Sequence, residues 1–450
     1  MKLSDRIYRI NPSATLEMTA KAAELKRANQ PVFNMSVGEP DFSTPQNIQN
    51  AAKFAIDNDH TKYTPGSGTH HLKTAILDKI QRDNNLKYNL ENVIVSCGGK
   101  HSLYNACQTL FQTGDEVIIF SPYWVSFPDF VSVTGAKPVF VKTNSLRQYE
   151  PDFNDLQMKI NSNTKGLIIN SPSNPTGGVW SDEAVLKVLD LCKNKDIWIF
   201  SDECYEQLVY SDNFHSIASL TNQNDKILTF QSCSKTYAMT GWRIGYTVGD
   251  KNVIKGMSKL QGQSTSCPNS IAQYAAAEAL TGDQSCSKTY AMTGWRIGYT
   301  VGDKNVIKGM SKLQGQSTSC PNSIAQYAAA EALTGDQSCV LEMKNIFKSR
   351  RDLILKELSK NSNIHCETPN GAFYVFPDLS YYFGSFDNNG NKIKNSNDLC
   401  LYILDQTGVV TVAGESFGAN NNIRLSYATS EQNIIEAVGH MNKALSKLNF

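Results

Sequence analysis

The 450-residue chain lacks the features that mark several large classes of protein. No apolar run approaches the roughly 18 residues of a membrane span, and no apolar segment of a signal peptide follows the basic start. The 43 Lys and Arg nearly balance the 42 Asp and Glu, so the net charge of +1 offers no field that attracts nucleic acid or anionic membranes. The 11 cysteines include no C-x-x-C pair, which argues against a zinc site or a disulfide framework. We therefore expect a cytoplasmic protein that acts on small molecules, with no nucleic-acid, membrane or metal partner.

One long segment of the chain occurs twice. Residues 231–283 recur without a substitution as residues 284–336, a period of 53 residues. Repeat architectures diverge between units and need about three of them to bury a continuous core. A segment that occurs only twice is therefore not a solenoid. We expect a fold of 397 residues that carries a duplicated insert of 53 residues.

Short apolar runs typical of strands alternate with amphipathic helical stretches through the middle of the chain. This alternation predicts an α/β fold, a mostly parallel sheet with helices on both faces. The predicted strands are residues 92–97, 115–120, 166–170, 198–202 and 226–232. The C-terminal part reads as a smaller α+β domain. The expected units are an N-terminal arm with part of the small domain at 1–45, a large domain at 46–339, and the C-terminal small domain at 340–450.

Polar residues and glycines gather where the predicted strands end. Ligands on parallel sheets bind beside the carboxyl ends of the strands, so these residues predict one site. They are Gly98-Gly99-Lys100, Ser121-Pro122-Tyr123-Trp124, Asn174 and Asp202.

A further motif places a lysine, Lys235, just after the last predicted strand, with Arg243 eight residues beyond it. A lysine can hold an aldehyde cofactor as a Schiff base, and pyridoxal 5′-phosphate (PLP) also needs a cradle for its phosphate and a carboxylate for its pyridine nitrogen. By itself, a lysine in this position is more often an ordinary solvated residue. The surrounding motifs favour the cofactor hypothesis.

In this combination of motifs the chain resembles the class I PLP-dependent aminotransferases, and among them the bacterial-type aspartate aminotransferases. The resemblance covers nearly the whole chain once the insert is set aside, and it implies the fold type I of PLP transferases. The motifs occur in family order: SVGEPDFSTP (36–45), KYTPGSG (62–68), CGGKHSL (97–103), SPYWVSFPDFV (121–131), NSPSNPTGG (170–178), SDECYE (201–206), SCSKTYAMTGWRIGY (232–246), PNGAFYVFP (369–377) and NIRLSY (422–427).

The resemblance implies a role for each residue around the cofactor ring. Lys235 would bind PLP as a Schiff base and move the proton during catalysis. Asp202 would pair with the pyridine nitrogen, although an Asp before a loop often only caps a helix. Asn174 and Tyr205 would bond the phenolic oxygen, and Trp124 would stack on the ring unless it is merely a core aromatic.

The resemblance also assigns the phosphate of PLP to the start of a helix. Unpaired N–H groups at a helix N-terminus favour an anion. The phosphate contacts would be Gly99, Lys100, Ser232, Ser234 and Arg243, with Tyr63 reaching in from the neighbouring subunit of a homodimer.

For the substrate, the resemblance implies that Arg424 holds the α-carboxylate, a planar two-point contact that lysine cannot copy. Lys100 and Thr15 would hold the distal carboxylate of an acidic substrate; their alternatives are a solvated lysine and a helix-capping threonine. The other substrate contacts would be Gly38, Trp124, Asn174 and Phe373.

The duplication offers two candidate lysines, Lys235 and Lys288. Only Lys235 follows a predicted strand, because Lys288 follows a helix and its glycine-containing stop. If the 53 extra residues form an insertion at a surface loop, the fold still includes Lys235 and Arg243. We therefore predict that Lys235 is the catalytic lysine.

The expected reaction is transfer of the amino group of aspartate to 2-oxoglutarate, giving oxaloacetate and glutamate, by a ping-pong Schiff-base mechanism. Two alternatives stay open. One is another fold type I PLP reaction, such as that of a β-lyase or a decarboxylase, because fold does not determine chemistry. The other is an inactive protein disabled by the insert.

Overall fold

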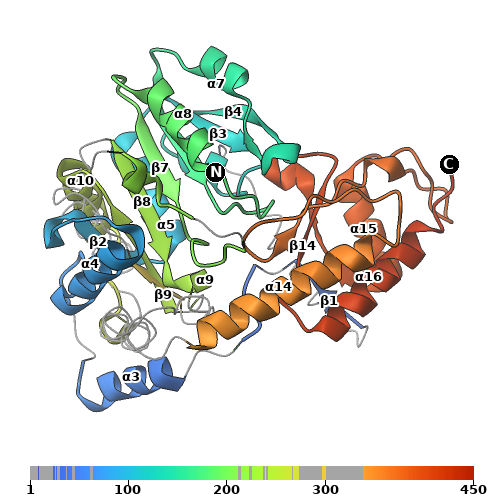
Figure 1. Ribbon diagram of the computed structural model, residues 1–450, viewed down its shortest axis with the longest axis horizontal. Helices are drawn as coiled ribbons and strands as arrows, with labels where there is room; N and C mark the ends of the chain where they lie inside the picture. Colours follow the sequence, from blue (N-terminus) through green and yellow to red (C-terminus); the bar gives the residue numbers. More distant parts are fainter. Residues whose placement is uncertain are drawn as a thin grey trace, which may run out of the picture.

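The structure is a computed structural model of the chain. It describes residues 9, 24, 25, 27, 31–36, 38–42, 46–60, 64–210, 214–221, 226–236, 239, 242–265, 267–272, 296–299 and 338–450. Figure 1 shows two lobes, one built around a large sheet and one formed mostly by the C-terminal residues.

Among the described residues, the sheet of the larger lobe has nine strands, in the order β10-β9-β8-β7-β6-β3-β4-β5, with β2 also paired to β9. Its centre is parallel, whereas β2, β5 and β9 each run antiparallel to a neighbour. The bounds are β2 (Val93–Cys97), β3 (Glu116–Ser121), β4 (Lys137–Asn144), β5 (Glu150–Pro151), β6 (Thr164–Asn170), β7 (Trp198–Asp202), β8 (Ile227–Ser232), β9 (Trp242–Val248) and β10 (Arg296–Tyr299).

Helices cover both faces of this sheet (Figure 1), which explains why β2, β3, β6 and β8 are buried along nearly their whole length instead of alternating. Several of these helices are capped at their N-termini by a side chain. Thr69, Ser181 and Asp250 each accept a hydrogen bond from a backbone N–H of the first turn that follows. The helices are α3 (Gln46–Asp57), α4 (His70–Asn84), α5 (Gly99–Leu110), α6 (Phe127–Ser132), α7 (Phe153–Lys159), α8 (Asp182–Cys192), α9 (Cys233–Thr236) and α10 (Lys251–Gly262).

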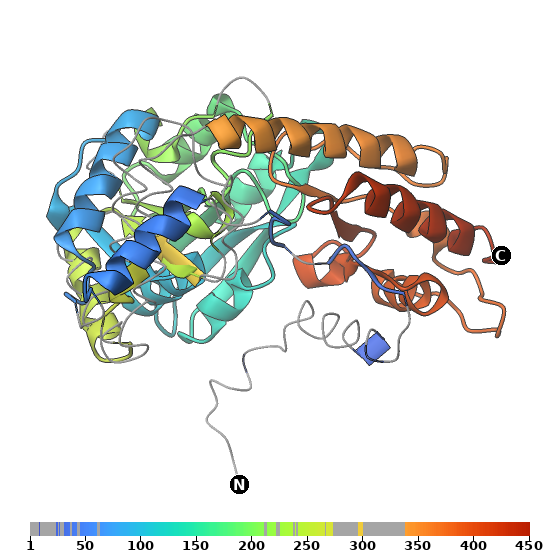
Figure 2. The same ribbon diagram turned by 90° about the horizontal axis from the view of Figure 1, so that it is seen from below.

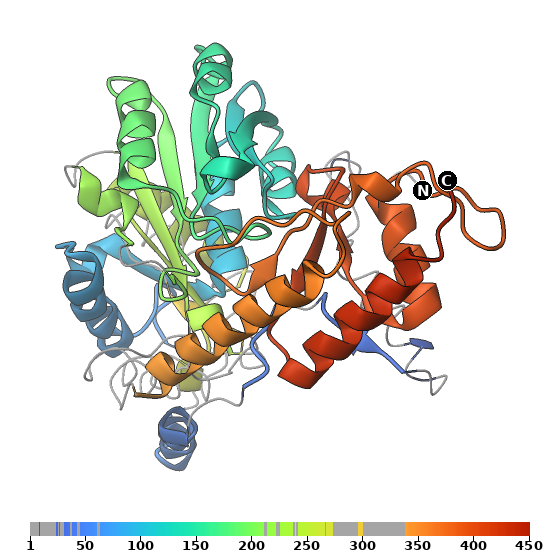
Figure 3. The ribbon, with the colours of Figure 1, turned by 45° about the vertical axis from the view of Figure 1, so that its right-hand side comes forward.

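The smaller lobe has its own core and is joined to the larger one by the long helix α14 (Ser338–Leu358). Figures 2 and 3 show α14 reaching from the sheet lobe to lie beside α16. The strand β1 pairs with β12, so residues 33–34 pack with the C-terminal residues. The remaining elements are β1 (Phe33–Asn34), β11 (Tyr374–Val375), α15 (Ser396–Thr407), β12 (Val409–Val410), β13 (Val412–Ala413), β14 (Ile423–Ser426) and α16 (Glu431–Leu445).

The duplicated segment contributes to the sheet chiefly through its first copy. The last two residues of β8 and all of α9, β9 and α10 come from residues 231–283. Of the second copy, the structure describes only β10, which pairs in parallel with its counterpart β9 and sets Arg296 opposite Trp242. Lys288 lies outside the described residues.

Candidate active site

At one end of the candidate site, the backbone of Gly98 lies close to the guanidinium of Arg243. Gly98 precedes α5 with a φ of +91°, and a Cβ atom placed on it would lie 2.1 Å from Nη2 of Arg243. A Cβ on Gly245 would lie 2.1 Å from the backbone nitrogen of Gly99. Only glycine, which has no Cβ, leaves room for these contacts, and glycine also adopts a positive φ at little cost in free energy. The two glycines therefore allow Arg243 and the start of α5 to meet.

Arg243 itself adopts a φ of +53°, which is unusual for a residue other than glycine. Its Nη2 donates a hydrogen bond to the carbonyl oxygen of Cys97 at 3.0 Å. Burial and, secondarily, the charge of Arg243 lower the pKa of His101 to about 3, so His101 is neutral near pH 7. Near pH 7, His101 therefore adds no positive charge at this end of the sheet, whereas Arg243 does.

Two serines border the same point. Ser232 ends β8, and its Oγ accepts a hydrogen bond from the backbone N–H of Ser234 at 3.0 Å; both serines are buried. A Cβ on Gly99 would lie 3.3 Å from Cβ of Ser232. Hydroxyls, a guanidinium and a helix N-terminus thus lie close together because glycines permit their approach, and this donor set fits a phosphate group. Lys235 lies on α9, one residue beyond Ser234.

Asp202 ends β7 and is only 5% exposed. It accepts a hydrogen bond from the backbone N–H of Cys204 at 3.2 Å, and among the described residues it forms no ion pair. Burial raises its pKa to about 6. A buried carboxylate of this kind is stabilised by a cationic partner, which the protonated nitrogen of a pyridine ring would supply.

Aromatic side chains continue the site toward the smaller lobe. The hydroxyl of Tyr205 lies 3.1 Å from that of Tyr374, and burial raises the pKa of Tyr205 well above its usual value. Phe373 packs edge-on against Tyr205 and stacks on Phe347, with ring centroids 5.8 and 5.5 Å apart. The side chain of Phe373 is fully buried in the core of the smaller lobe, so its predicted role as a pocket wall remains a prediction.

Arg424, on β14, is 3% exposed and joins both lobes. Its Nη1 donates to Oδ1 of Asn174 at 2.9 Å, and its Nη2 donates to the carbonyl oxygen of Ser36 at 2.6 Å. Its guanidinium also lies over the ring of Tyr374, 4.6 Å from the centroid. The Nε atom is buried and has no hydrogen-bond partner among the described residues. An unpaired donor in an oriented guanidinium fits recognition of a carboxylate.

Lys100 and Trp124 lie together at the start of α5. The ammonium of Lys100 is 5.2 Å from the centroid of the Trp124 ring. That ring packs edge-on against Phe127 and Phe130 and is half-buried, so it serves partly as core. The structure thus brings together two residues for which cofactor or substrate contacts were predicted.

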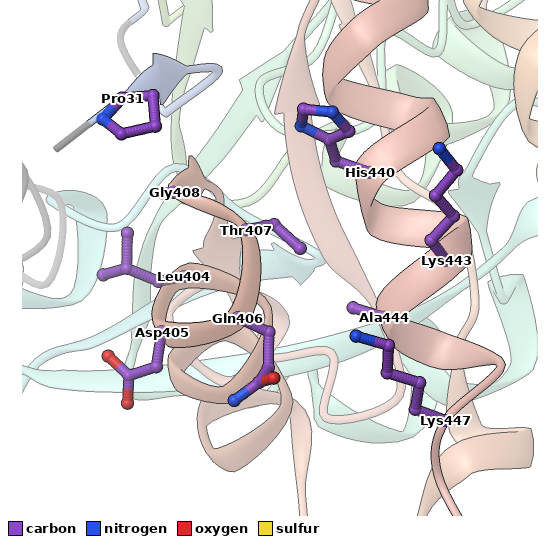
Figure 4. A pocket seen from close by; sticks show the side chains of 10 residues that line it. All are labelled: Pro31, Leu404, Asp405, Gln406, Thr407, Gly408, His440, Lys443, Ala444 and Lys447. Carbon is purple, nitrogen blue, oxygen red and sulfur yellow. The ribbon is translucent and has the colours of Figure 1, made fainter.

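Some predicted site residues are less fully placed. Thr15 and Tyr63 lie outside the described residues, and Gly38 is described and half-buried. None of the predicted site residues lines the cavity of about 390 Å³ between the C-terminal end of α15 and α16 (Figure 4). This cavity is bordered by Pro31, Leu404, Asp405, Gln406, Thr407, Gly408, His440, Lys443, Ala444 and Lys447.

Sequence reasoning missed a buried polar cluster around Lys79. The signal was present: the buried positions Leu72, Ala75, Ile76 and Lys79 of α4 follow helical spacing, which places the lysine on the apolar face. A lysine is almost never fully buried unless it is paired.

Neither a membrane-spanning helix nor a metal-binding cluster occurs among the described residues. None of their helices is long and apolar enough to cross a membrane. They contain no group of three or more His, Cys, Asp or Glu arranged to hold a metal ion.

Comparisons with known proteins agree on one family. The family model "Aminotransferase class I and II" matches residues 30–284 and 283–441, two segments that meet at the boundary between the copies. The chain is 38% identical to a probable aspartate/prephenate aminotransferase of Rhizobium leguminosarum bv. phaseoli, covering 97% of this chain and 96% of the relative. It is 36% identical to an aspartate aminotransferase of Bacillus subtilis, covering 99% and 100%.

Solved structures lead to the same family. The aspartate aminotransferase of Rhizobium meliloti matches with a TM-score of 0.84 and 34% identity over 100% of both chains. The aspartate aminotransferase of Thermus thermophilus with maleate matches with a TM-score of 0.80 and 33% identity over 99% of this chain and 100% of that one. None of these four relatives is named as a β-lyase or a decarboxylase, so they give no support to those alternatives.

Proposed function

The chain belongs to the class I and II aminotransferase family, and on that premise we propose that it is a PLP-dependent aspartate aminotransferase. It would transfer the amino group of aspartate to 2-oxoglutarate in a ping-pong exchange, in which the first 2-oxo acid leaves before the second binds. One observation carries the proposal: Ser232 and the buried carboxylate of Asp202 end the neighbouring strands β8 and β7, while Arg424 comes from the other lobe and bonds Asn174.

The chain's own residues suit the parts of PLP. Asp202 would pair with the pyridine nitrogen, and Asn174 and Tyr205 would bond the phenolic oxygen. The phosphate would bind at Gly99, Lys100, Ser232, Ser234 and Arg243. When bound, PLP supplies an aldehyde that condenses with amines and a protonated ring that withdraws electrons from the substrate Cα.

Lys235 would then act as the base that takes the proton from the substrate Cα. Its place on α9, directly after β8, keeps it beside the serines of the cradle. Asp202 is held at the end of the neighbouring β7, so the backbone of two paired strands sets the distance between base and carboxylate.

The substrate would be held at both ends. Arg424 would bind the α-carboxylate through a guanidinium already oriented by Asn174 and Ser36. Lys100 and Thr15 would bind the distal carboxylate, because burying that charge unpaired would cost several kcal/mol. The Thermus thermophilus aspartate aminotransferase was solved with maleate, which is likewise a dicarboxylate.

The same proposal includes the remaining contacts and the assembly. Gly38, Phe373 and Trp124 would border the substrate. Tyr63 would reach the phosphate from the second protomer of a homodimer, so that each site needs both chains.

A coupled assay tests this function. The purified protein, loaded with PLP, is mixed with aspartate and 2-oxoglutarate, and formation of oxaloacetate is followed. We expect turnover with aspartate that exceeds turnover with alanine, and none in Lys235→Ala. Absence of transfer from any amino acid by a protein that binds PLP would contradict the proposal and favour the inactive alternative.

A further inference from the structure

A buried lysine on α4 has no part in the chemistry described so far. The side chain of Lys79 is 1% exposed. Its ammonium donates hydrogen bonds to Oδ1 of Asn84 and Oε1 of Gln231, each at 2.9 Å, and forms an ion pair with Glu206. Its ammonium also lies 3.8 Å from Oδ2 of Asp83, so its oxygen partners come from three segments of the chain.

The partners of Lys79 also bond one another. Oε2 of Glu206 accepts hydrogen bonds from Nδ2 of Asn84 at 2.8 Å and from Nε2 of Gln231 at 2.7 Å. The hydroxyl of Tyr246 donates to Oε1 of Gln231. We call Lys79, Asn84, Glu206, Gln231 and Tyr246 the buried network; every member is 7% exposed or less.

Outside α4, each segment of the network adjoins a residue proposed to hold the cofactor. Glu206 follows Tyr205, Gln231 precedes Ser232, and Tyr246 lies three residues beyond Arg243 on β9. Successive side chains of a strand point to opposite faces, so Gln231 and Ser232 point away from each other. The network can therefore act on the site only through the backbone.

A neighbouring carboxyl group binds the network to the turn after β7. Oε2 of Glu203 accepts a hydrogen bond from Nε2 of Gln231 at 3.2 Å, and its Oε1 accepts one from Oγ of Ser201 at 2.7 Å. Burial and then the nearby Glu206 raise the pKa of Glu203 to about 7. Near neutral pH, Glu203 is thus partly protonated.

Stability alone is a weak reason for such a network. Removing two charges from water costs several kcal/mol per ion, and replacing a buried ion pair with uncharged residues of similar volume is often neutral or stabilising. A polar network with every member paired does, however, hold its segments in one arrangement.

We infer that Lys79, Glu206 and Gln231 are positioning residues that lock the turn after β7 against β8, and so set Asp202 and Tyr205 relative to Ser232. This inference rests on the proposed function, because the positions it concerns are those of the cofactor-holding groups. It predicts that the network controls how tightly and in what state the cofactor is held, beyond any effect on folding.

The test removes both charges together. The double variant Lys79→Met with Glu206→Gln keeps the side-chain volumes and removes both charges of the buried ion pair, while Asp83 keeps its contact with Arg82. The matched control is Lys137→Met with Glu116→Gln, which removes an ion pair with a 2.9 Å contact at the starts of β3 and β4, the edge opposite the site. For each protein, the melting temperature of the cofactor-free form, the Kd for PLP and the pH titration of the bound-cofactor absorbance are measured.

We expect the double variant to melt within a few degrees of the parental protein, to bind PLP at least about tenfold more weakly and to show a shifted absorbance titration, while the control changes none of these. Parental Kd and titration in a folded double variant would overturn the inference.

If the double variant does not fold, the Tyr246→Phe variant decides, since it deletes only the hydroxyl that donates to Gln231. Its Kd for PLP should rise at least about threefold, and an unchanged Kd would refute the positioning role. Failure of the parental protein to bind PLP would instead contradict the proposed function.

Discussion

Replacing Arg424 by lysine tests how the site would recognise a carboxylate. The arginine holds Asn174 and the carbonyl of Ser36 with two separate nitrogens, and its Nε remains unpaired among the described residues. A lysine keeps the positive charge but has a single nitrogen on a flexible stem. It can reach one of the two internal partners or a carboxylate, whereas the guanidinium can hold several groups in one plane.

The size of the effect follows from these contacts. Hydrogen bonds to charged groups contribute about 1.5–3 kcal/mol each. Loss of one point of a two-point carboxylate contact, together with looser orientation of the rest, should cost about 3 kcal/mol, or roughly 100-fold in kcat/KM for aspartate. The free energy of unfolding should fall by about 1–3 kcal/mol, because Ser36 or Asn174 loses its buried partner.

Steady-state kinetics with aspartate and the Kd of maleate, an unreactive dicarboxylate, measure the first effect, and urea denaturation measures the second. The matched control is Arg351→Lys, another buried arginine, which donates to the carbonyl of Pro369 at 3.2 Å and to Asp352. It should lose stability without a comparable loss of maleate affinity. Parental kcat/KM and maleate affinity in Arg424→Lys would refute the reasoning.

Three further predictions concern the cofactor and the acidic substrate. Borohydride reduction of the PLP-loaded protein, followed by tryptic mapping, should place the label on Lys235; label mainly on Lys288 would show that the second copy is used. Lys100→Met should lower kcat/KM for aspartate at least about tenfold, roughly 1.4 kcal/mol, with a much smaller change for alanine. Equal losses for both donors would assign Lys100 to the phosphate instead. Burial raises the pKa of Asp202 to about 6, so the folded cofactor-free protein binds a proton that the unfolded chain releases above about pH 4, and stability should fall as pH rises from 4 to 6. Asp202→Asn should lose less stability over this range, by up to about 3 kcal/mol in urea denaturation; an equal loss would mean that Asp202 does not titrate there.

Local patterns were sufficient to predict five strands of the sheet, whereas β4, β5, β9 and β10 were not predicted. Residues 198–202 form β7 as expected, and the other four predicted strands begin and end within two residues of the observed ones. Buried parallel strands need continuous apolar runs, and such runs are visible in the chain itself. Strand direction was not predicted: β9 runs antiparallel to β8, which the short connection over 233–241 favours, because a parallel pair needs a crossover of a dozen or more residues.

The sequence by itself determined which residue types and motifs are present, and hence the family. It also predicts Lys235 as the catalytic lysine, because of the two candidates only Lys235 follows a predicted strand. Tertiary structure decided what those residues contact. Arg424 meets Asn174 from 250 positions away, and Lys79 meets Glu206 from 127 positions away. The physical reason is that helical and strand periodicity report only which side of an element is buried, whereas a hydrogen bond or ion pair depends on which elements the completed fold packs against that side.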